Sequence, residues 1–187
     1  MSELRDVDDW QAVLAGDGEA FGRLWDRHSS RIERHVAALV SRPADIDDAV
    51  AVVFLQAWRK RRSVRFVDGS LLPWLLVTAT HVSHNARRGS QRYAALLARL
   101  PIVDPAPDPA ELLVDGDAGR AMRRLSVLDQ EILTLCVLEE LTEREAATAL
   151  HIRPGTVKSR LHRARARLAD QFQALSSVPH NVEGSTP

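Results

Sequence analysis

The chain contains a single cysteine, Cys136, so it cannot form an internal disulfide. Cys136 lies in an apolar run, and we expect it to be a core thiol rather than a redox sensor. Aromatic residues make up only 5% of the 187 residues. No apolar stretch reaches the roughly 18 residues of a membrane-spanning helix, and the acidic N-terminus MSELRDVDDW does not resemble a signal peptide. We therefore expect a cytoplasmic protein without membrane insertion.

The sequence also lacks the usual signatures of catalysis. It has no Gly-rich phosphate loop, no H-E-x-x-H pattern and no Ser/His/Asp arrangement of note. A metal-dependent hydrolase would have to use three clustered acids and scattered histidines, namely Asp45, Asp47, Asp48, His28, His35, His81 and His84. The acids have a simpler explanation, because carboxylates in a first turn stabilise a helix N-terminus. We expect no enzymatic activity, no metal site and no cofactor.

Almost every apolar pattern that is present has a helical period, which predicts an all-α protein. Four helices are expected in the first half, over residues 5–15, 18–40, 45–61 and 71–98, with a loop at 63–70. The buried side of the second helix is expected to consist of Phe21, Leu24, Trp25, Ile32, Val36 and Leu39. Phe54 and Trp58 lie four residues apart on the third helix and are expected to be core residues.

An acidic, proline-rich connector divides the chain. Residues 100–119 hold four prolines and five acids, and their composition predicts an extended linker. We predict two small helical domains, residues 1–98 and 120–172, joined by a flexible linker over 99–119. The polar tail, residues 173–187, is expected to be disordered. One or two lead-in helices are expected over 117–138.

Residues 142–168 are the most informative stretch, because they predict a helix–turn–helix. Thr142 and Glu145 have the spacing of a capping box at a helix start. Residues 151–153 make the turn, and Pro154 suits the first position of a second helix. On that helix Val157, Leu161, Ala164 and Leu168 form one apolar stripe.

The opposite side of this second helix is basic. Residues 151–168 contain six Lys or Arg and no acid. Such a helix fits the major groove of duplex DNA, with its N-terminal half near base edges. A second basic stretch, residues 61–99, holds seven basic residues and one acid, although the whole chain has a net charge of zero. Two separated basic patches suggest two DNA contacts and a different surface for another partner.

Three segments in this order resemble bacterial RNA polymerase sigma factors of the extracytoplasmic-function type. They are ADIDDAVAVVFLQAWR (44–59), LLPWLLVTATHVSHNARR (71–88) and LDQEILTLCVLEELTEREAATALHIRPGTVKSRLHRARARL (128–168). The motif GTVKSRLHRAR is shared in part with other helix–turn–helix regulators. The segment FLQAWR, followed by PWLL, extends the resemblance from helix–turn–helix regulators in general to sigma factors.

The resemblance implies binding to core RNA polymerase, through the β′ clamp helices and the β subunit, and recognition of promoter DNA. Asp45, Asp47 and Asp48 would belong to the polymerase-binding surface. The −10 element would be held by Val67, Asp68, His81, Asn85, Arg87 and Arg88. The −35 element would be contacted by Thr156, Lys158, Ser159, Arg160, His162 and Arg163. Members of the family are often held inactive by an anti-sigma protein, which is a further expected partner.

The chain departs from the family pattern at four positions. Ala51 and Val52 stand where relatives commonly have Gln-Glu, so this face of the third helix is more apolar. His81 stands in place of a common Asn, and Asn85 in place of a common Asp, both within the expected −10 surface.

A stand-alone helix–turn–helix regulator, which binds duplex DNA without polymerase, is the alternative. It explains the basic helix equally well. It does not explain the second basic patch or the loop beside Trp74. We expect a sigma factor in which core polymerase fixes the spacing of two tethered, mutually mobile domains, so that both promoter elements are engaged together.

Overall fold

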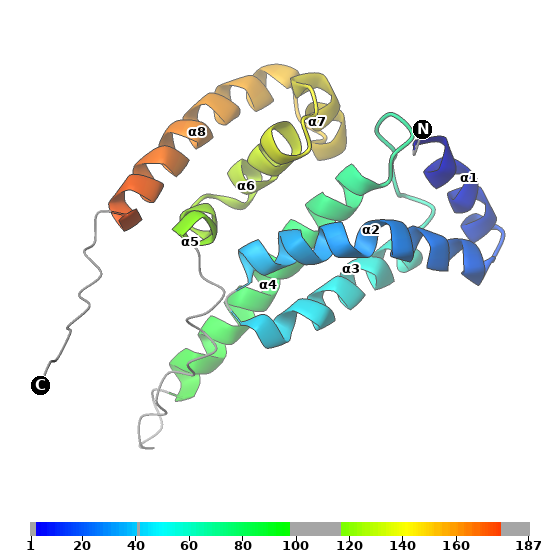
Figure 1. Cartoon of the computed structure of the whole chain (residues 1–187), viewed down its shortest axis with the longest axis horizontal. Coiled ribbons are helices and arrows are strands. Elements are labelled where there is room, and N and C mark those ends of the chain that lie inside the picture. Colours follow the sequence, from blue (N-terminus) through cyan, green and yellow to red (C-terminus); the bar gives the residue numbers. More distant parts are fainter. Residues whose placement is uncertain (1–2, 41, 98–116, 177–187) are drawn as a thin grey trace, which may run out of the picture.

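The structure is a computed structural model that describes residues 3–40, 42–97 and 117–176. The first half contains α1 (Glu3–Leu14), α2 (Gly18–Leu39), the 3₁₀ turn η1 (Pro43–Asp45), α3 (Ile46–Arg59) and α4 (Leu72–Leu97). The second half contains α5 (Asp117–Arg123), α6 (Val127–Leu133), the π-helical turn η3 (Thr134–Leu138), α7 (Glu143–Leu150) and α8 (Pro154–Ser176). The predicted all-α fold is confirmed (Figure 1).

Local signals account for several of the helix ends. Gly16, with a φ of +97°, follows α1, and Asp17 caps α2 by accepting hydrogen bonds from the N–H groups of Glu19 and Ala20. Pro43 opens η1 ahead of α3. Most of the predicted linker and of the predicted tail lie outside the described residues, but residues 117–119 belong to α5 and residues 173–176 to α8, so these parts are helical rather than flexible. Within the part of the chain that is described, no helix combines the length and apolar character of a membrane span.

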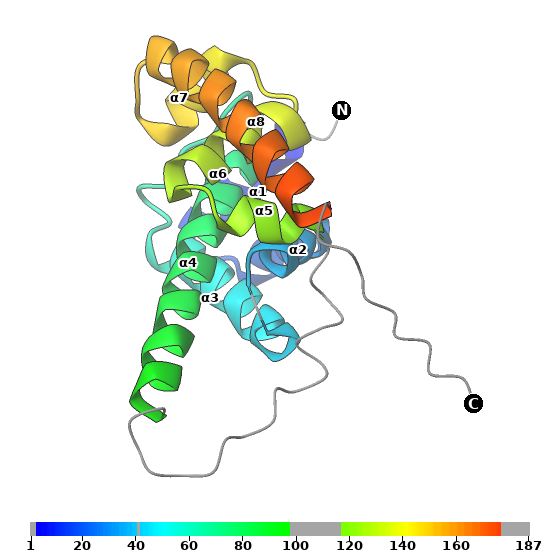
Figure 2. The same cartoon turned by 90° about the vertical axis from the view of Figure 1, so that its left-hand side faces the viewer.

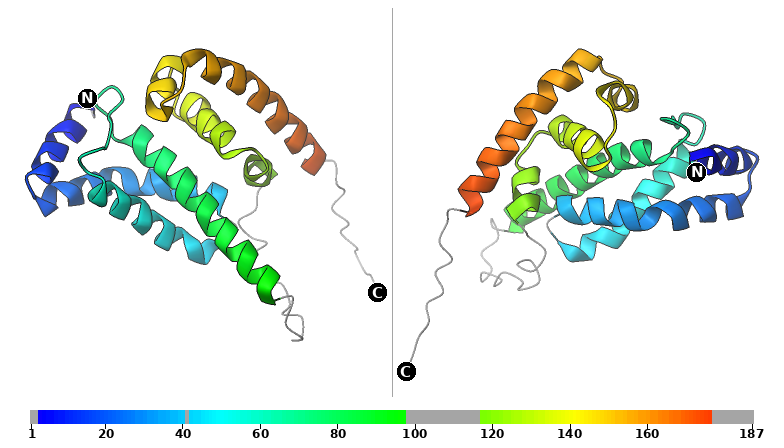
Figure 3. Two further views of the ribbon diagram at one scale, coloured as in Figure 1. Left: turned by 180° about the vertical axis from the view of Figure 1, so that it is seen from behind. Right: turned by 45° about the horizontal axis from the view of Figure 1, so that its top comes forward.

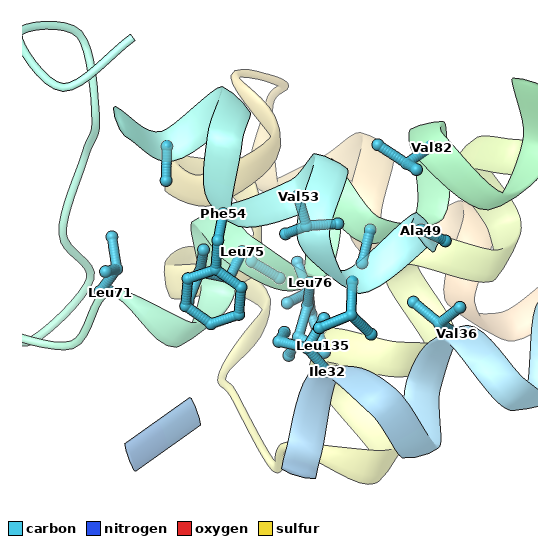
Figure 4. Packing of buried hydrophobic residues seen from close by; sticks show 14 of the residues in the cluster. Ile32, Val36, Ala49, Val53, Phe54, Leu71, Leu75, Leu76, Val82 and Leu135 are labelled. Carbon is cyan, nitrogen blue, oxygen red and sulfur yellow. The ribbon is translucent and has the colours of Figure 1, made fainter. Parts of the chain in front are cut away.

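The first half is built on three helices that pack against one another, α2, α3 and α4, with α1 lying on α2. The expected buried side of α2 is confirmed for Leu24, Ile32, Val36 and Leu39, which are 3% exposed or less. Four aromatic side chains complete this side of the core, namely Phe21, Trp25, Phe54 and Trp58. Full burial of one large apolar side chain stabilises a fold by roughly 1.5–3 kcal/mol, so buried residues such as Ile32, Val36 and Phe54 contribute most to this packing (Figure 4).

Two histidines that the apolar pattern did not place in the core are also buried on α2. His28 Nε2 lies 2.9 Å from Asp6 Oδ2, and His35 Nε2 lies 2.9 Å from Thr80 Oγ1. Burial lowers the pKa of His35 to about 4, so this ring is neutral at physiological pH. Both histidines therefore serve as hydrogen-bonded core residues.

The two halves of the chain share one apolar cluster. Leu135 of η3 belongs to the same buried cluster as Ile32 of α2 and Leu76 of α4 (Figure 4). Helices α6 and α7 contact α4, and α5 contacts α2, so the second half lies along one side of the first (Figures 2 and 3). We expected two mutually mobile domains; the structure instead presents them packed together.

Polar contacts cross the same boundary. The guanidinium of Arg31 meets the carboxylate of Glu139 with N–O distances of 2.6 and 3.1 Å. Arg87 donates to the backbone oxygen of Arg123 at 2.9 Å, and Arg123 donates to that of Ala38 at 3.2 Å. The boundary therefore combines a shared apolar core with hydrogen bonds at its edge.

Glu131 of α6 is the most perturbed acid at this boundary. Its side chain is 5% exposed, and its Oε1 lies 3.1 Å from Nε2 of His81 on α4, without hydrogen-bond alignment. Burial raises the pKa of Glu131 to about 7, and burial together with Lys60 lowers the pKa of His81. Both shifts favour the uncharged forms. At pH 7 about half of the Glu131 side chains are therefore protonated, and His81 is largely neutral.

We predict that Glu131 makes the fold less stable above neutral pH. The ordinary pKa of a glutamate is 4.5, and that of Glu131 in the folded protein is about 7. Between these two pH values the folded protein holds a proton that the unfolded chain releases. The stabilising effect of that proton is complete below the ordinary pKa and is lost as the pH rises through 7. From pH 6 to pH 8 the loss is about 1 kcal/mol. Glu131→Gln should remove this part of the pH dependence.

The measurement is urea unfolding of both proteins at pH 6 and pH 8, with Glu140→Gln as a control at an exposed acid in the same half. Taking the difference between wild type and variant removes the contribution of the histidines that titrate in the same range. An identical pH dependence in wild type and Glu131→Gln would contradict the prediction.

Candidate nucleic-acid and polymerase interfaces

Helices α7 and α8 form the helix–turn–helix that residues 142–168 predict. The capping box is present, since Thr142 N–H donates to Glu145 Oε2 at 2.6 Å and Glu145 N–H donates to Thr142 Oγ1 at 3.3 Å. His151, with a φ of +57°, ends α7 in the left-handed conformation, and Pro154 begins α8. The turn and both helix starts are confirmed.

The two faces of α8 are separated as predicted. Val157, Leu161 and Ala164 are buried, and Leu168 packs partly buried against the same cluster. Helices α5, α6 and α7 cover this apolar side. On the other side Lys158, Ser159, His162 and Arg163 are exposed, and Thr156 is half-buried. A polar, mostly basic surface is thus held on a helix whose orientation the core determines.

Arg160, a member of the predicted −35 set, is paired with an acid on another helix. Its guanidinium lies 3.0 Å from Oδ1 of Asp129, and Arg167 lies 3.3 Å from Oδ2 of the same residue. Asp129 is on α6 and is 2% exposed. A buried carboxylate that is paired with two arginines holds α8 against α6, because breaking such a pair would leave a charge uncompensated.

The loop between α3 and α4 ends in a small hairpin, residues 67–70. Val67 and Ser70 exchange backbone hydrogen bonds of 3.1 and 3.0 Å. The two residues between them, Asp68 and Gly69, have φ angles of +49° and +77°, as a tight two-residue turn requires. Val67 is buried and Asp68 is exposed. Of these two predicted −10 residues, Asp68 therefore presents its side chain at the surface and Val67 does not.

The second half of the chain closes over this hairpin. A cavity of about 420 Å³ is lined on one side by Val67, Asp68 and Ser70 and on the other by residues 139–141 and Glu145. Hydrogen bonds with the side chain of Asp68 and with Thr142 hold the pKa of Glu145 below its usual range. Arg65, just before the hairpin, lies 3.3 Å from Nδ1 of His151.

The four predicted −10 residues on α4 fall into two groups. His81, Asn85 and Arg88 are exposed and follow one another at helical spacing along one stripe. Arg87 lies off this stripe and is directed toward α5, where its guanidinium contacts the Arg123 carbonyl. His81 contacts Glu131 of α6. Asn85 and Arg88 therefore lie farther along α4 than the contact with α6.

The predicted polymerase-binding acids lie at the start of α3. Asp47 and Asp48 are exposed, and Asp45 is half-buried at the N-cap position. A groove of about 430 Å³ between α3 and α4 is lined by Asp45, Asp48, Val52 and Asn85, among others. Asp48 and Asn85, which were expected on different surfaces, thus line one groove. Val52 and Leu55 on the exposed side of α3 are 40% and 49% exposed.

Sequence reasoning missed a buried ionic network between α1 and α2. Asp6 and Asp9 bind Arg27, Asp9 also binds Arg23, and His28 contacts Asp6. The signal was available, since two acids three residues apart on one helix precede two arginines four residues apart on the next.

The acids and histidines that a metal-dependent hydrolase would have to use do not form a metal site in the described residues. Among the described residues, no three His, Cys, Asp or Glu side chains are placed to hold a metal ion together. Burial raises the pKa of the Cys136 thiol, as expected for an unreactive, partly buried cysteine.

Comparison with known families identifies both halves of the chain. Residues 24–93 match Sigma-70 region 2, and residues 116–168 match Sigma-70 region 4. The chain is 32% identical to the ECF RNA polymerase sigma factor SigM of Mycobacterium tuberculosis over 170 residues, which cover 89% of this chain and 84% of that protein. It is 27% identical to the ECF sigma factor BldN of Streptomyces coelicolor, over 85% of this chain and 62% of that protein.

Two solved structures share the fold. CnrH, determined in complex with the cytosolic domain of CnrY, superposes with a TM-score of 0.64 at 22% identity, over 91% of this chain and 98% of that one. RpoE of Bartonella quintana, determined with the anti-sigma factor NepR, gives a TM-score of 0.58 at 23% identity, over 82% and 96%. The matches to regions 2 and 4, together with the 32% identity to SigM, show that the chain belongs to the ECF family of RNA polymerase sigma factors, which direct core polymerase to promoters.

Proposed function

We propose that this sigma factor contacts the −35 element with α8 and the −10 element with the 67–70 hairpin and α4. The proposal divides the chain into a region 2 domain, residues 1–98, a linker, residues 99–119, and a region 4 domain, residues 120–172. The observation that carries it is the exposed polar face of α8, which stands opposite a buried apolar face that orients the helix. RNA synthesis itself belongs to the polymerase.

In the −35 assignment, Lys158, Ser159, His162 and Arg163 contact duplex DNA in the major groove, and Thr156 lies at the start of the helix. These side chains lie in the first three turns of α8, where a recognition helix approaches base edges. Arg160 has a different role in the proposal. Its pairing with buried Asp129 supports a function in positioning α8.

In the −10 assignment, the hairpin captures an extruded base and α4 holds the opened strand. Since the Val67 side chain is buried, the contacts come from Asp68 and the hairpin backbone. His81, Asn85 and Arg88 line an exposed stripe that could follow the strand, and Arg87 adds charge beside it. Extrusion has an unstacking penalty of roughly a few kcal/mol, which contacts to all edges of the base can offset.

In the polymerase assignment, Asp45, Asp47 and Asp48 supply charge and the neighbouring apolar side chains supply burial. The exposed Val52 and Leu55 support a mixed surface, in which a partner covers apolar area beside the acids. The β′ clamp helices are the proposed partner, with a further contact to the β subunit. An anti-sigma protein is a proposed regulatory partner, supported by the complexes in which the two structural neighbours were determined. We place the protein in the cytoplasm, where polymerase acts.

These assignments require the two halves to separate. The hairpin faces residues 139–145, and His81 and Arg87 contact α6 and α5. The region 4 domain lies close to the hairpin and to the start of the α4 stripe, so DNA could reach both together only after the halves move apart. Binding to core polymerase would therefore select an open form, and its apparent affinity would be reduced by the fraction of closed protein.

Run-off transcription with core polymerase on fragments of the source genome tests the function directly. We expect discrete transcripts that depend on the protein and disappear when residues 1–98 are deleted. Footprints of the protein alone on duplex DNA, without transcripts, would favour a stand-alone regulator instead.

Arg163→Ala should weaken binding of the holoenzyme to the −35 element by roughly 1–3 kcal/mol if Arg163 contacts a base. The matched control is Arg165→Ala, an exposed arginine two residues further along α8 and on another side of the helix. Affinity should be measured by fluorescence anisotropy on the cognate −35 sequence and on a scrambled one. An equal loss on both sequences would make Arg163 a phosphate contact rather than a base contact.

Charge reversal at the domain boundary tests the closed form. Arg31→Glu should replace the bidentate pair with Glu139 by repulsion and open the free protein. A change of about 1 kcal/mol in closure would tighten apparent binding to core polymerase up to about fivefold. Arg31→Glu combined with Glu139→Arg should restore both wild-type affinity and the wild-type radius of gyration, measured by small-angle X-ray scattering. Additive effects of the two substitutions would show that the pair does not hold the halves together.

A further inference from the structure

We propose that Asp6 on α1 is the positioning residue of the 67–70 hairpin, and that Trp10 on the same helix holds the other end of the loop. This inference rests on the proposed role of the hairpin at the −10 element. The N-terminal helix α1 lies before the region 2 match at residues 24–93. The inference gives this helix a direct part in presenting the hairpin that contacts the −10 element.

Asp6 is 1% exposed and connects three parts of the fold. Its Oδ2 accepts hydrogen bonds from His28 Nε2 on α2 and from the backbone N–H of Leu71, each at 2.9 Å. Its Oδ1 binds the guanidinium of Arg27. Leu71 directly follows the hairpin and precedes α4. The carboxylate therefore fixes the point at which the hairpin joins the helix.

The charge of Asp6 is maintained in this buried position. Burial alone would raise the pKa of its carboxyl group, but hydrogen bonds from His28, the Leu71 N–H and Arg27 outweigh burial and hold the pKa below its usual range. A charged acceptor makes a stronger hydrogen bond to a backbone N–H than a neutral one. Without the Asp6 carboxylate, the Leu71 N–H would be buried without this hydrogen-bond acceptor, which is unfavourable.

Trp10 holds the opposite end of the same loop. Its indole N–H donates to the backbone oxygen of Arg61 at 3.0 Å, and its ring meets Phe66 edge-on at 6.1 Å. One turn of α1 separates Asp6 from Trp10. Residues 61 and 71 are thus both tied to α1, and the exposed hairpin tip lies between two anchored ends.

Asp9 provides an internal comparison for this inference. It lies on the same helix and joins the same network, with Oδ2 2.7 Å from Arg27 and Oδ1 2.8 Å from Arg23. Its hydrogen bonds run to α2 and not to the hairpin. Loss of Asp9 weakens the attachment of α1 to α2, whereas loss of Asp6 also releases Leu71.

The first experiment is hydrogen–deuterium exchange on the full-length free protein, comparing wild type, Asp6→Ala, Asp6→Asn and Asp9→Ala. We expect at least tenfold faster exchange in peptides covering 61–72 for Asp6→Ala, and less than a twofold change there for Asp9→Ala. Asp6→Asn keeps an oxygen that can accept from Leu71 but loses the charge that pairs with Arg27, so exchange at 61–72 should lie between wild type and Asp6→Ala. Thermal melts identify any variant that fails to fold, and Trp10→Phe, which keeps an aromatic ring and removes the N–H donor, then tests the other anchor.

The second experiment measures the rate of open-complex formation by the reconstituted holoenzyme. The promoter, found by run-off transcription, is supplied in two forms: fully duplex, and already unpaired at the −10 element. Asp6→Ala should slow opening of the duplex promoter at least tenfold. On the unpaired template the rate should recover partly, and the affinity for core polymerase should equal that of wild type. Equal exchange and opening defects in Asp6→Ala and Asp9→Ala, or no change in exchange at 61–72, would overturn the positioning role. Faster exchange with unchanged opening would instead overturn the use of the hairpin at the −10 element, which is the proposed function.

Discussion

The burial of α4 on several sides is the constraint on which the rest of the structure depends. Its apolar residues, such as Leu75, Leu76 and Ala79, are buried with those of α2 and α3, and α6 and α7 contact it as well. A helix packed in this way has few positions left for function. The stripe of His81, Asn85 and Arg88 consists of positions that the core of the first half does not use, and this is why the proposed strand-binding surface is narrow.

Several acids are buried in the fold, which helps to reconcile a net charge of zero with a basic surface on α8. Asp6, Asp129 and Glu131 are buried, and the first two each bind basic side chains that position a helix. Lys158 and Arg163 remain exposed on α8. Burying a carboxylate within an ion pair removes its field from the surface, whereas an exposed arginine keeps its own. The exposed Lys158 and Arg163 thus keep their charge on α8, whereas Asp129 offsets the charge of Arg160 and Arg167.

The closed arrangement and the proposed DNA contacts compete for the same residues. An apolar cluster that runs from Ile32 and Leu76 to Leu135 favours closure, and the pair of Arg31 and Glu139 adds to it at the edge. Polymerase and promoter would have to offset this packing by binding the open form. In the closed form the region 4 domain lies beside the hairpin and the start of the α4 stripe, so the proposed −10 surface is exposed there but shares its space with that domain.

Local pattern in the sequence was sufficient for the helices, the capping box of Thr142 and Glu145, the turn before Pro154, the two faces of α8 and the family. These features depend on residues within a few positions of one another, so spacing alone encodes them. Only the tertiary structure decided which polar residues are engaged inside the fold: Arg160 pairs with Asp129, the Val67 side chain is buried, and Asp6 binds a backbone N–H 65 residues away. Such partners meet because helices pack, and no local period records which distant side chain will face which.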